Sequence, residues 1–221
     1  MLYIVPTPLG NLGDITERSK LALENCDFII AENPATTHKL LQLLKLPKKP
    51  VVQFADHNER LVLKKYLDRL QNETACLVSD AGTPAISDPG FRLVRAAREV
   101  NLEVVALPGA NAATTALSAS GLPTDRYIFV GFFPKTEHKV CELVKMAGTT
   151  QSTLIAYESP QRITKTLEYI GKSFPEVNCV VARELTKMHE EYLRGTPSEI
   201  LATLKQRAVL KGEITFLLSF K

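Results

Sequence analysis

Residues 76–90 read CLVSDAGTPAISDPG, an aliphatic run followed at once by a dozen small and turn-forming residues from Ser79 to Gly90. The aliphatic run Cys76–Val78 is typical of a buried strand. Glycine in the following segment permits positive φ and a close approach of the backbone to a ligand, and proline stiffens the loop. A connection this long is more often functional than idle, although Asp80 and Asp88 could instead cap turns or helices. The segment therefore predicts a ligand-binding loop at the end of a strand.

Similar aliphatic runs recur along the chain, and segments with helical spacing separate them. One such segment has an apolar face made by Leu63, Tyr66, Leu67 and Leu70 and charged residues elsewhere, as in an amphipathic crossover helix. This alternation of strands and helices predicts α/β architecture. The other predicted strands are Leu2–Val5, Phe28–Ala31, Val51–Phe54, Glu103–Ala106, Ile128–Val130, Thr153–Tyr157, Asn178–Ala182 and Ile214–Phe220.

Two local patterns predict boundaries. Asp14 and Glu17 have capping-box-like spacing, which predicts a helix that starts at Asp14 and runs to about Asn25. The densest cluster of turn formers near the middle of the chain is Ser120–Asp125, SGLPTD. We therefore expect two α/β domains, residues 1–118 and 119–221.

The composition is ordinary for a globular protein, with 45% hydrophobic and 23% charged residues among 221 and a net charge of +3. This excludes collagen-like, disordered and disulfide-scaffold classes, while the charge neither demands nor excludes a nucleic-acid partner. The four cysteines are far apart and have no C-x-x-C or His pairing, so we expect buried thiols and no metal. The apolar runs Met1–Pro6 and Ile214–Phe220 fit neither a signal peptide nor a membrane span, so we expect no membrane association and a cytoplasmic location.

Ligands bind at the carboxyl ends of strands in open α/β sheets, so the segments after the predicted strands are candidate sites. Pro6–Asp14 has neither G-x-G-x-x-G nor P-loop spacing, which disfavours an ordinary Rossmann site and a Walker nucleotide site. Small residues in Pro108–Ala113 would let a flat ligand lie against the backbone, although alanines are also simply good helix formers. Arg183–Glu191 holds two basic residues, one His and three carboxylates, which fits a functional loop and a solvated turn equally.

Basic side chains are spread along the chain rather than massed. Lys45, Lys48 and Lys49 flank Pro47, and a predicted helical stripe carries arginines at 92, 95 and 98. These groups would bind phosphates if the partner were a nucleic acid, and otherwise they are solvated surface charges.

Five segments carry a resemblance to a known family: Pro6–Thr16, Ser79–Gly90, Ala119–Arg126, Tyr157–Pro160 with Arg162, and Ala182–Gly195. Together they resemble the tetrapyrrole methylase superfamily, and within it the branch that 2′-O-methylates a cytidine in the decoding region of 16S rRNA. The resemblance covers essentially the whole chain in the right order, which makes it more specific than any single motif.

The resemblance implies a two-domain α/β fold with S-adenosylmethionine bound in the cleft between the domains. It also implies a homodimer that acts on 16S rRNA in the small ribosomal subunit. The cofactor-binding positions that it implies in this sequence are Leu9, Gly10, Asp80, Ala81, Gly82, Thr83, Pro84, Gly109, Ala110, Asn111, Ala112, Tyr157, Glu158, Ser159, Ala182, Arg183, Ile214 and Thr215.

The chain departs from the family pattern in three places. Where the family usually reads A-E-D-T-R, this chain reads AENPA from Ala31 to Ala35, so it keeps Glu32 but lacks an acid, a hydroxyl and an arginine. We therefore expect weaker engagement of the substrate. Ala110-Asn111 replaces a common Pro-Ser, which keeps the side chains small. The chain ends at Lys221, whereas many members continue into a small extension, so we expect no RNA contact from such an extension.

The chemistry that the resemblance implies is methyl transfer from a sulfonium, an in-line displacement whose main demand is alignment of donor and acceptor. A ribose hydroxyl is weakly acidic, so a positioned base would help. Glu32, Glu158 and Glu184 each follow a predicted strand and are the candidate catalytic residues, and the sequence does not choose among them. Two alternatives stay open: a tetrapyrrole or other small-molecule acceptor, because fold does not fix function, and a non-catalytic S-adenosylmethionine-binding protein.

Overall fold

The computed structural model describes residues 1–55 and 58–220, which form two compact units, Met1–Asn111 and Ala112 onward. The sequence places the boundary at 118/119, which falls inside helix α5 (Ala112–Ser120). This helix belongs wholly to the second unit because it packs against strands β7, β8 and β10 of that unit's sheet. The turn formers at 120–125 are therefore the connection that follows α5, and not the junction between the units.

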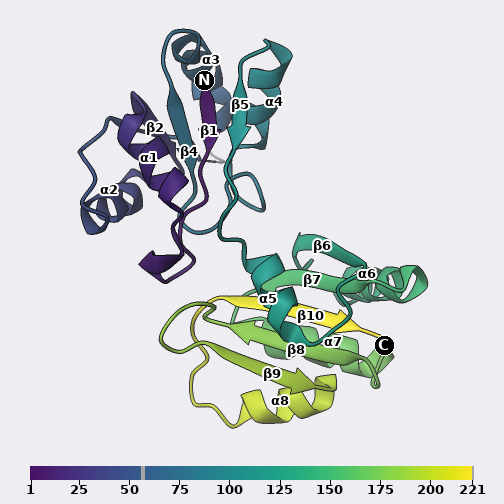
Figure 1. Ribbon diagram of the computed structural model, residues 1–221. Helices are drawn as coiled ribbons and strands as arrows, with labels where there is room; N and C mark the ends of the chain where they lie inside the picture. The colour runs from purple at the N-terminus through teal and green to yellow at the C-terminus, as the bar shows by residue number, and fades with distance from the viewer. Residues whose placement is uncertain (56–57, 221) are drawn as a thin grey trace. The chain divides into compact units, whose positions relative to one another are not determined.

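The first unit is a five-stranded, all-parallel sheet in the order β3-β2-β4-β1-β5 (Figure 1). Its strands are short and aliphatic, as predicted, and each is followed by a connection at the same edge of the sheet. The strands are β1 (Leu2–Ile4), β2 (Phe28–Ala31), β3 (Val51–Gln53), β4 (Ala75–Val78) and β5 (Val104–Ala106), and the helices are α1 (Glu17–Asn25), α2 (Pro34–Leu43), α3 (Glu59–Leu70) and α4 (Phe91–Glu99).

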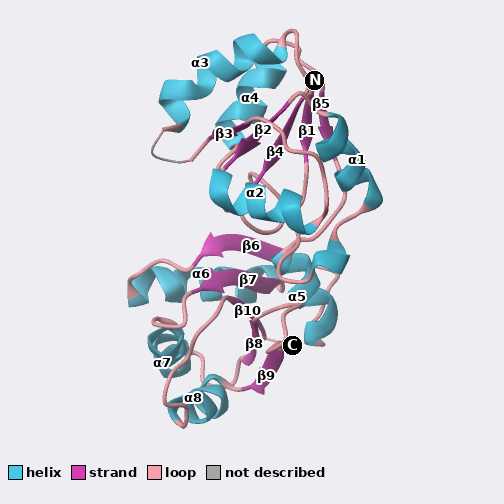
Figure 2. Cartoon of the chain, turned by 90° about the vertical axis from the view of Figure 1, so that its left-hand side faces the viewer, coloured by secondary structure: helices cyan, strands magenta, loops and turns pink. Residues whose placement is uncertain are grey.

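Helices cover both faces of this sheet, which explains why its strands are apolar on both sides. In β2, Phe28 and Ile30 pack with α3 and α4 on one face, and Ile29 and Ala31 pack with α1 and α2 on the other. Figures 1 and 2 show this doubly covered arrangement. The core of the unit is therefore two apolar layers, one on each side of the sheet.

Helix α1 begins later than the sequence predicts. Its N-cap is Thr16, whose Oγ1 accepts a hydrogen bond from the backbone N–H of Ser19 at 3.1 Å. Asp14 instead ends a separate 3-10 turn, η1 (Leu12–Asp14), which Asn11 caps. The prediction of a start at Asp14 was wrong because Asp14 ends the 3-10 turn, and Thr16, two residues further on, caps the helix.

The second unit has a mixed sheet in the order β6-β7-β10-β8-β9. Its neighbours β6 and β7 pair in parallel, and the other neighbouring strands pair antiparallel. Helices α6, α7 and α8 pack on one face through residues such as Val144, Leu167 and Leu204, and α5 packs on the other. The strands are β6 (Tyr127–Phe132), β7 (Thr153–Glu158), β8 (Asn178–Arg183), β9 (Glu191–Gly195) and β10 (Ile214–Ser219), and the helices are α6 (Glu137–Thr150), α7 (Ile163–Ser173) and α8 (Pro197–Lys205).

Strand β9 is absent from the sequence prediction. Its residues EYLRG are partly polar and only half-buried, because β9 forms an edge of the sheet and pairs with β8 alone. Strand β10, in contrast, is fully buried at the centre of the sheet between β7 and β8.

Three of the four cysteines are buried, as expected, and the fourth is not. All four are free; Cys26, Cys76 and Cys179 are buried, whereas Cys141 is half-buried. Burial raises the pKa of the Cys179 thiol well above its ordinary value. Within residues 1–55 and 58–220, the side chains form no cluster suited to holding a metal ion, and no helix is long and apolar enough to cross a membrane.

Candidate functional site

The carboxyl edge of the first sheet gathers the loops that the sequence singles out. Strands β4, β1 and β5 are adjacent and parallel, so the segments that follow them leave the sheet side by side. The predicted cofactor residues of this unit are Leu9, Gly10, Asp80, Ala81, Gly82, Thr83, Pro84, Gly109, Ala110 and Asn111, and all of them lie in these three segments. Such an edge is the usual ligand site of an open α/β sheet.

Hydrogen bonds tie the three loops together. Thr7 after β1 and Gly82 after β4 exchange two backbone hydrogen bonds, each of 2.9 Å. The Thr83 hydroxyl donates to the carbonyl oxygen of Ala110, after β5, at 2.8 Å. The Thr7 hydroxyl also donates to the Ser79 carbonyl oxygen at 3.1 Å and is buried. The loops are therefore linked into one pre-organised unit.

Two glycines allow this close approach of the loops. Gly82 has φ of +84°, and a Cβ there would lie 3.2 Å from the Leu9 side chain. A Cβ at Gly109 would lie 2.6 Å from the Pro6 side chain, which is closer than real Cβ contacts. A larger residue at either position would push the loops apart.

Glu32 and Asp80 lie next to each other at the same edge, because β2 and β4 are neighbours. The Asp80 backbone N–H donates to Glu32 Oε2 at 3.3 Å. Partial desolvation by the surrounding loops raises the pKa of the exposed Asp80 carboxyl, and a hydrogen bond from Thr36 in α2 opposes this shift. The edge thus presents two carboxylates from sequence positions 48 residues apart.

The departure from the family pattern at 33–35 forms the start of helix α2. Asn33 is the N-cap, and its side-chain oxygen accepts from the backbone N–H of Ala35 at 3.0 Å. Pro34 occupies the first turn, where its fixed φ suits a helix and no N–H is needed. The local structure is therefore well formed, although the segment contributes no cation.

The predicted cofactor residues of the second unit also lie at one end of their sheet. In the strand register, Thr215 faces Tyr157 and Ala182 on its two sides, and Ile214 faces Glu158 and Arg183. Ala182, Ile214 and Thr215 are buried, whereas Tyr157, Ser159 and Arg183 are half-buried. Ala112, the remaining predicted residue, is the first residue of α5.

Glu158 is held entirely by its own unit. Its carboxylate is buried and accepts from the Ser159 backbone N–H at 2.8 Å and from the Thr166 hydroxyl at 2.7 Å. Arg162 lies 3.4 Å from the same carboxylate and donates to the carbonyl oxygens of Phe133 and Pro134. These contacts give Glu158 a structural role at the start of α7 and disfavour it as a catalytic base.

Glu184 is likewise engaged. Its Oε1 accepts from Lys187 Nζ at 2.9 Å and from the backbone N–H of Glu213 at 3.0 Å. The hydrogen bond from Lys187 lowers the pKa of the Glu184 carboxyl. The Glu184 carboxylate therefore links the turn after β8 to Glu213, the residue before β10. Of the three candidate bases, Glu32 is the one that lies at the carboxyl edge of the first sheet.

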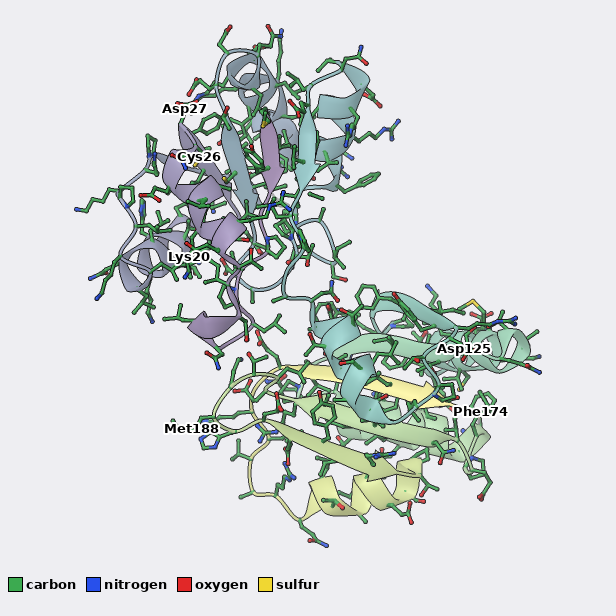
Figure 3. All side chains as sticks on the ribbon, viewed as in Figure 1. Lys20, Cys26, Asp27, Asp125, Phe174 and Met188 are labelled. Carbon is green, nitrogen blue, oxygen red and sulfur yellow. The ribbon has the colours of Figure 1, made fainter. Side chains whose placement is uncertain are left out.

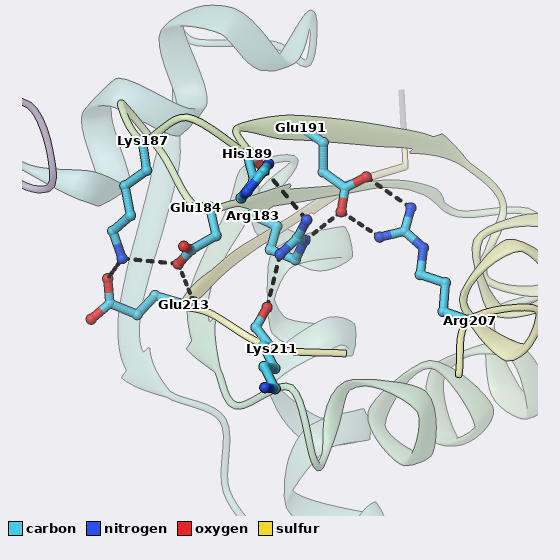
Figure 4. A network of polar contacts seen from close by, with 8 residues as sticks. All are labelled: Arg183, Glu184, Lys187, His189, Glu191, Arg207, Lys211 and Glu213. Carbon is cyan, nitrogen blue, oxygen red and sulfur yellow. Dashed lines mark hydrogen bonds and ion pairs between the residues drawn. The ribbon is translucent and has the colours of Figure 1, made fainter. Parts of the chain in front are cut away.

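A second charge cluster beside Glu184 was not predicted. Glu191 in β9 pairs with Arg183 and with Arg207, whose Nη2 lies 2.8 Å from Glu191 Oε2 (Figure 4). Arg183 also donates to the carbonyl oxygen of Lys211 at 2.9 Å. Hydrogen bonds from Arg207, and then from Arg183, lower the pKa of Glu191 to about 2. The charge density of 183–191 is visible in the sequence, but its partner Arg207 carries no local signal.

The cluster fixes both ends of the β8–β9 turn and leaves its tip free of the sheet. Met188 at this tip is 93% exposed and projects from the turn in Figure 3. Glu184 and Thr186 adopt positive φ of 54° and 64°, which ordinary side chains adopt only when their surroundings impose it.

Comparisons with known proteins support the sequence interpretation. Residues 1–201 match the family model of tetrapyrrole (corrin/porphyrin) methylases. The chain is 42% identical over 219 residues to the ribosomal RNA small subunit methyltransferase I of Hydrogenobaculum sp., covering 99% of this chain and 95% of that protein. The protein of the same name from Thermotoga maritima is 38% identical over 221 residues, with 100% and 98% covered, and that from Escherichia coli O157:H7 is 45% identical over 208 residues, with 93% and 72% covered.

Solved structures confirm the expected fold. A diphthine synthase superposes with a TM-score of 0.78 at 14% identity, covering 99% of this chain and 89% of that one. A cobalt precorrin-4 methyltransferase superposes with a TM-score of 0.72 at 18% identity, covering 99% and 94%. By sequence and by fold, the chain belongs to the tetrapyrrole methylase family of S-adenosylmethionine-dependent methyltransferases.

Proposed function

We propose that this methyltransferase transfers a methyl group from S-adenosylmethionine to the 2′-hydroxyl of a cytidine ribose in 16S rRNA of the small ribosomal subunit. The observation that carries the proposal is the match over nearly the whole chain to relatives named ribosomal RNA small subunit methyltransferase I. The linked loops at the carboxyl edge of the first sheet add a pre-organised binding surface.

The residues at this edge fit such a cofactor by their chemistry. S-adenosylmethionine carries a positive sulfonium and an ammonium group, which a carboxylate such as Asp80 complements. Small side chains at Ala81 and Ala110 leave the loop backbone accessible to a flat adenine ring. The residues of the first unit that we propose to hold the cofactor are Leu9, Gly10, Asp80–Pro84 and Gly109–Asn111.

The bound cofactor supplies an electrophilic methyl group on a sulfonium sulfur. The linked loops contribute alignment. They hold the bound methyl donor in one orientation, so that less conformational entropy is lost when the acceptor binds. In the proposal, the Glu32 carboxylate accepts the proton of the ribose 2′-hydroxyl as that oxygen attacks. Glu32 lies at the carboxyl edge that carries the proposed cofactor loops, beside Asp80, and this position supports Glu32 over Glu158 and Glu184.

We also propose that the protein acts as a cytoplasmic homodimer, as the resemblance implies. Strand β10 offers no surface for a second copy of the chain, because its apolar residues are buried at the centre of their own sheet. Edge strand β6 instead exposes Tyr127 and Phe132, and apolar side chains on an exposed edge favour association. Light scattering should return twice the chain mass, and a monomer mass over a wide concentration range would overturn the dimer.

Replacement of Asp80 tests the cofactor part of the proposal. Asp80→Ala should weaken S-adenosylmethionine binding at least tenfold, about 1.4 kcal/mol, because the ligand's cationic groups lose a carboxylate. Asp80→Asn keeps an acceptor for the Thr36 hydroxyl but removes the charge, so it should show most of the same loss. Titration calorimetry measures both, with Asp68→Ala on α3 as the exposed control. Unchanged affinity in folded Asp80 variants would remove this residue from the site.

A further inference from the structure

The segment from Asn33 to Ala55 has an unusual charge balance. Its 23 residues include four lysines and one histidine but no aspartate or glutamate. The whole chain, in contrast, has 27 Lys and Arg against 24 Asp and Glu. The segment includes α2, the connection to β3, strand β3 itself and the two residues after it.

Helix α2 is buried along one side only. Thr37 and Leu41 are buried against the sheet. His38, Lys39, Gln42 and Leu43 of the helix are exposed, and so are Lys45 and Lys48 in the connection that follows it. We call this surface the α2 face, and it consists of His38, Lys39, Gln42, Lys45 and Lys48.

The lysines of the α2 face lack the ion pairs that several other exposed cations make. Lys172 pairs with Glu137 at 3.0 Å, Lys205 with Glu168 at 2.9 Å, and Arg95 with Glu99 at 2.8 Å. Over residues 1–55 and 58–220, Lys39 and its two companions on the α2 face have no ion-pair partner. Their charge is therefore available to an external anion.

One of these lysines occupies a position that normally suits a smaller residue. Lys45 has φ of +56° and follows the end of α2, where Leu46 N–H donates to Leu41 O at 2.9 Å and Lys45 N–H to Gln42 O at 3.1 Å. Glycine or asparagine is the usual residue at this left-handed position. A cation near the C-terminal end of a helix also interacts favourably with the helix dipole. The effect of replacing Lys45 on stability therefore has to be measured separately from its effect on RNA binding.

The α2 face leads away from the proposed reaction edge. Helix α2 starts directly after Glu32, at the carboxyl edge of the sheet, and its ten residues extend about 15 Å. After the end of α2, Lys49 Nζ donates to the carbonyl oxygen of Cys26, which precedes β2 and is labelled in Figure 3. This bond anchors the connection that carries Lys45 and Lys48.

We propose that the α2 face is a contact surface for the phosphate backbone of the RNA that flanks the target nucleotide. The inference rests on the proposed function, since an acceptor ribose at the Glu32 edge would bring neighbouring nucleotides over α2. Exposed, unpaired cations close together in one segment neutralise phosphates without reading sequence. The face then supplies affinity and orientation for the RNA, while the choice of nucleotide is made at the edge.

The test is the triple variant Lys39→Gln, Lys45→Asn and Lys48→Gln, in which asparagine suits the left-handed backbone at 45. Its matched control is Lys65→Gln, Lys139→Gln and Lys145→Gln, which removes the same charge from exposed positions of α3 and α6 that also lack an ion pair among the described residues. Binding to fluorescently labelled 16S rRNA and to small subunits is measured by anisotropy at several salt concentrations, together with methyl transfer to the subunits.

The triple variant should bind RNA about tenfold more weakly, and the slope of log affinity against log salt should flatten by about two, from about 0.7 per single-stranded phosphate contact. Its affinity for S-adenosylmethionine and its melting temperature should equal those of the wild type, and the control variant should behave as the wild type throughout. Unchanged affinity and slope in the triple variant would overturn the inference. Weaker binding to subunits with unchanged binding to free rRNA would also overturn it, because the contact would then be to a ribosomal protein.

Two further outcomes separate this inference from the function on which it rests. If the wild type methylates subunits and the triple variant has the same KM, only the α2 face is excluded. If the wild type transfers no methyl group to RNA, the proposed function fails first. If the triple variant melts at a lower temperature than the wild type, Lys48→Glu replaces it in the binding and transfer assays. Lys48 lies beyond the helix, so its replacement should not disturb α2. A wild-type KM and a wild-type salt slope in Lys48→Glu would exclude the α2 face.

Discussion

Replacement of Glu191 by glutamine should destabilise the second unit through one defined contact. The Glu191 carboxylate joins Arg183 and Arg207, and all three side chains are mostly shielded from water, with exposures of 24%, 16% and 28%. Glutamine keeps the shape and one acceptor oxygen but removes the negative charge. Two guanidinium groups are then left close together without the carboxylate that compensated them.

The size of the effect follows from the pKa of Glu191. Its fall from 4.5 to about 2 corresponds to about 3 kcal/mol at about 1.36 kcal/mol per pH unit. Because the pKa is lowered in the folded protein, this stabilisation is complete above pH 4.5 and is lost as the pH falls towards 2. About 2 kcal/mol of it should disappear between pH 7 and pH 3. Partial replacement by the glutamine oxygen makes the expected loss about 2 to 3 kcal/mol at pH 7.

Urea unfolding at pH 7 and pH 3 measures the difference between the wild type and Glu191→Gln, with Glu176→Gln as an exposed control. Hydrogen exchange of the β8 and β9 amides assigns the loss to the second unit. The variant should be less stable at pH 7, and the gap should narrow by more than half at pH 3. An unchanged unfolding midpoint at pH 7, or a gap of constant size at both pH values, would refute the reasoning.

Three further replacements probe the first unit. Gly82→Ala should weaken S-adenosylmethionine binding at least tenfold in calorimetry, because φ of +84° and the Leu9 side chain at 3.2 Å both oppose a Cβ; wild-type affinity would show that the loop adjusts. Glu32→Gln should lower kcat for methyl transfer at least tenfold and remove the acidic limb of its pH profile, with cofactor affinity retained; a wild-type profile would exclude Glu32 as the base. Restoring the family triplet with Asn33→Asp, Pro34→Thr and Ala35→Arg should tighten subunit binding and steepen the salt slope by about one, since residue 35 is exposed at the start of α2; no gain in affinity would show that the triplet is dispensable here.

Most strands could be predicted from the sequence because they are short aliphatic runs buried on both faces, as in β2 with FIIA. Strand β9 could not, since half-buried EYLRG lacks such a run and follows a charged segment. The boundary was predicted at 118/119, whereas the units divide at 111/112. The small residues of α5 give no sequence signal of the sheet on which the helix packs. The start of α1 was displaced because Asp14 and Thr16 are both plausible caps.

For the candidate site, the sequence located the loops but not the contacts between them. Gly, Pro and Asp after β4 predict a ligand loop, whereas the bonds Thr7–Gly82 and Thr83–Ala110 depend on which strands become neighbours. The roles of the three glutamates could not be separated, because the burial of Glu158 and the pairing of Glu184 come from residues elsewhere in the chain.

The central claim is that the acceptor is a cytidine ribose of 16S rRNA. Small subunits from cells that lack the protein are incubated with the purified chain and S-adenosylmethionine labelled in the methyl group, and the 16S rRNA is digested to nucleosides and analysed by mass spectrometry. We expect label in 2′-O-methylcytidine, close to one methyl group per subunit, and loss of this label in Asp80→Ala. Label in a base-methylated nucleoside, or no label from a protein that binds S-adenosylmethionine, would contradict it.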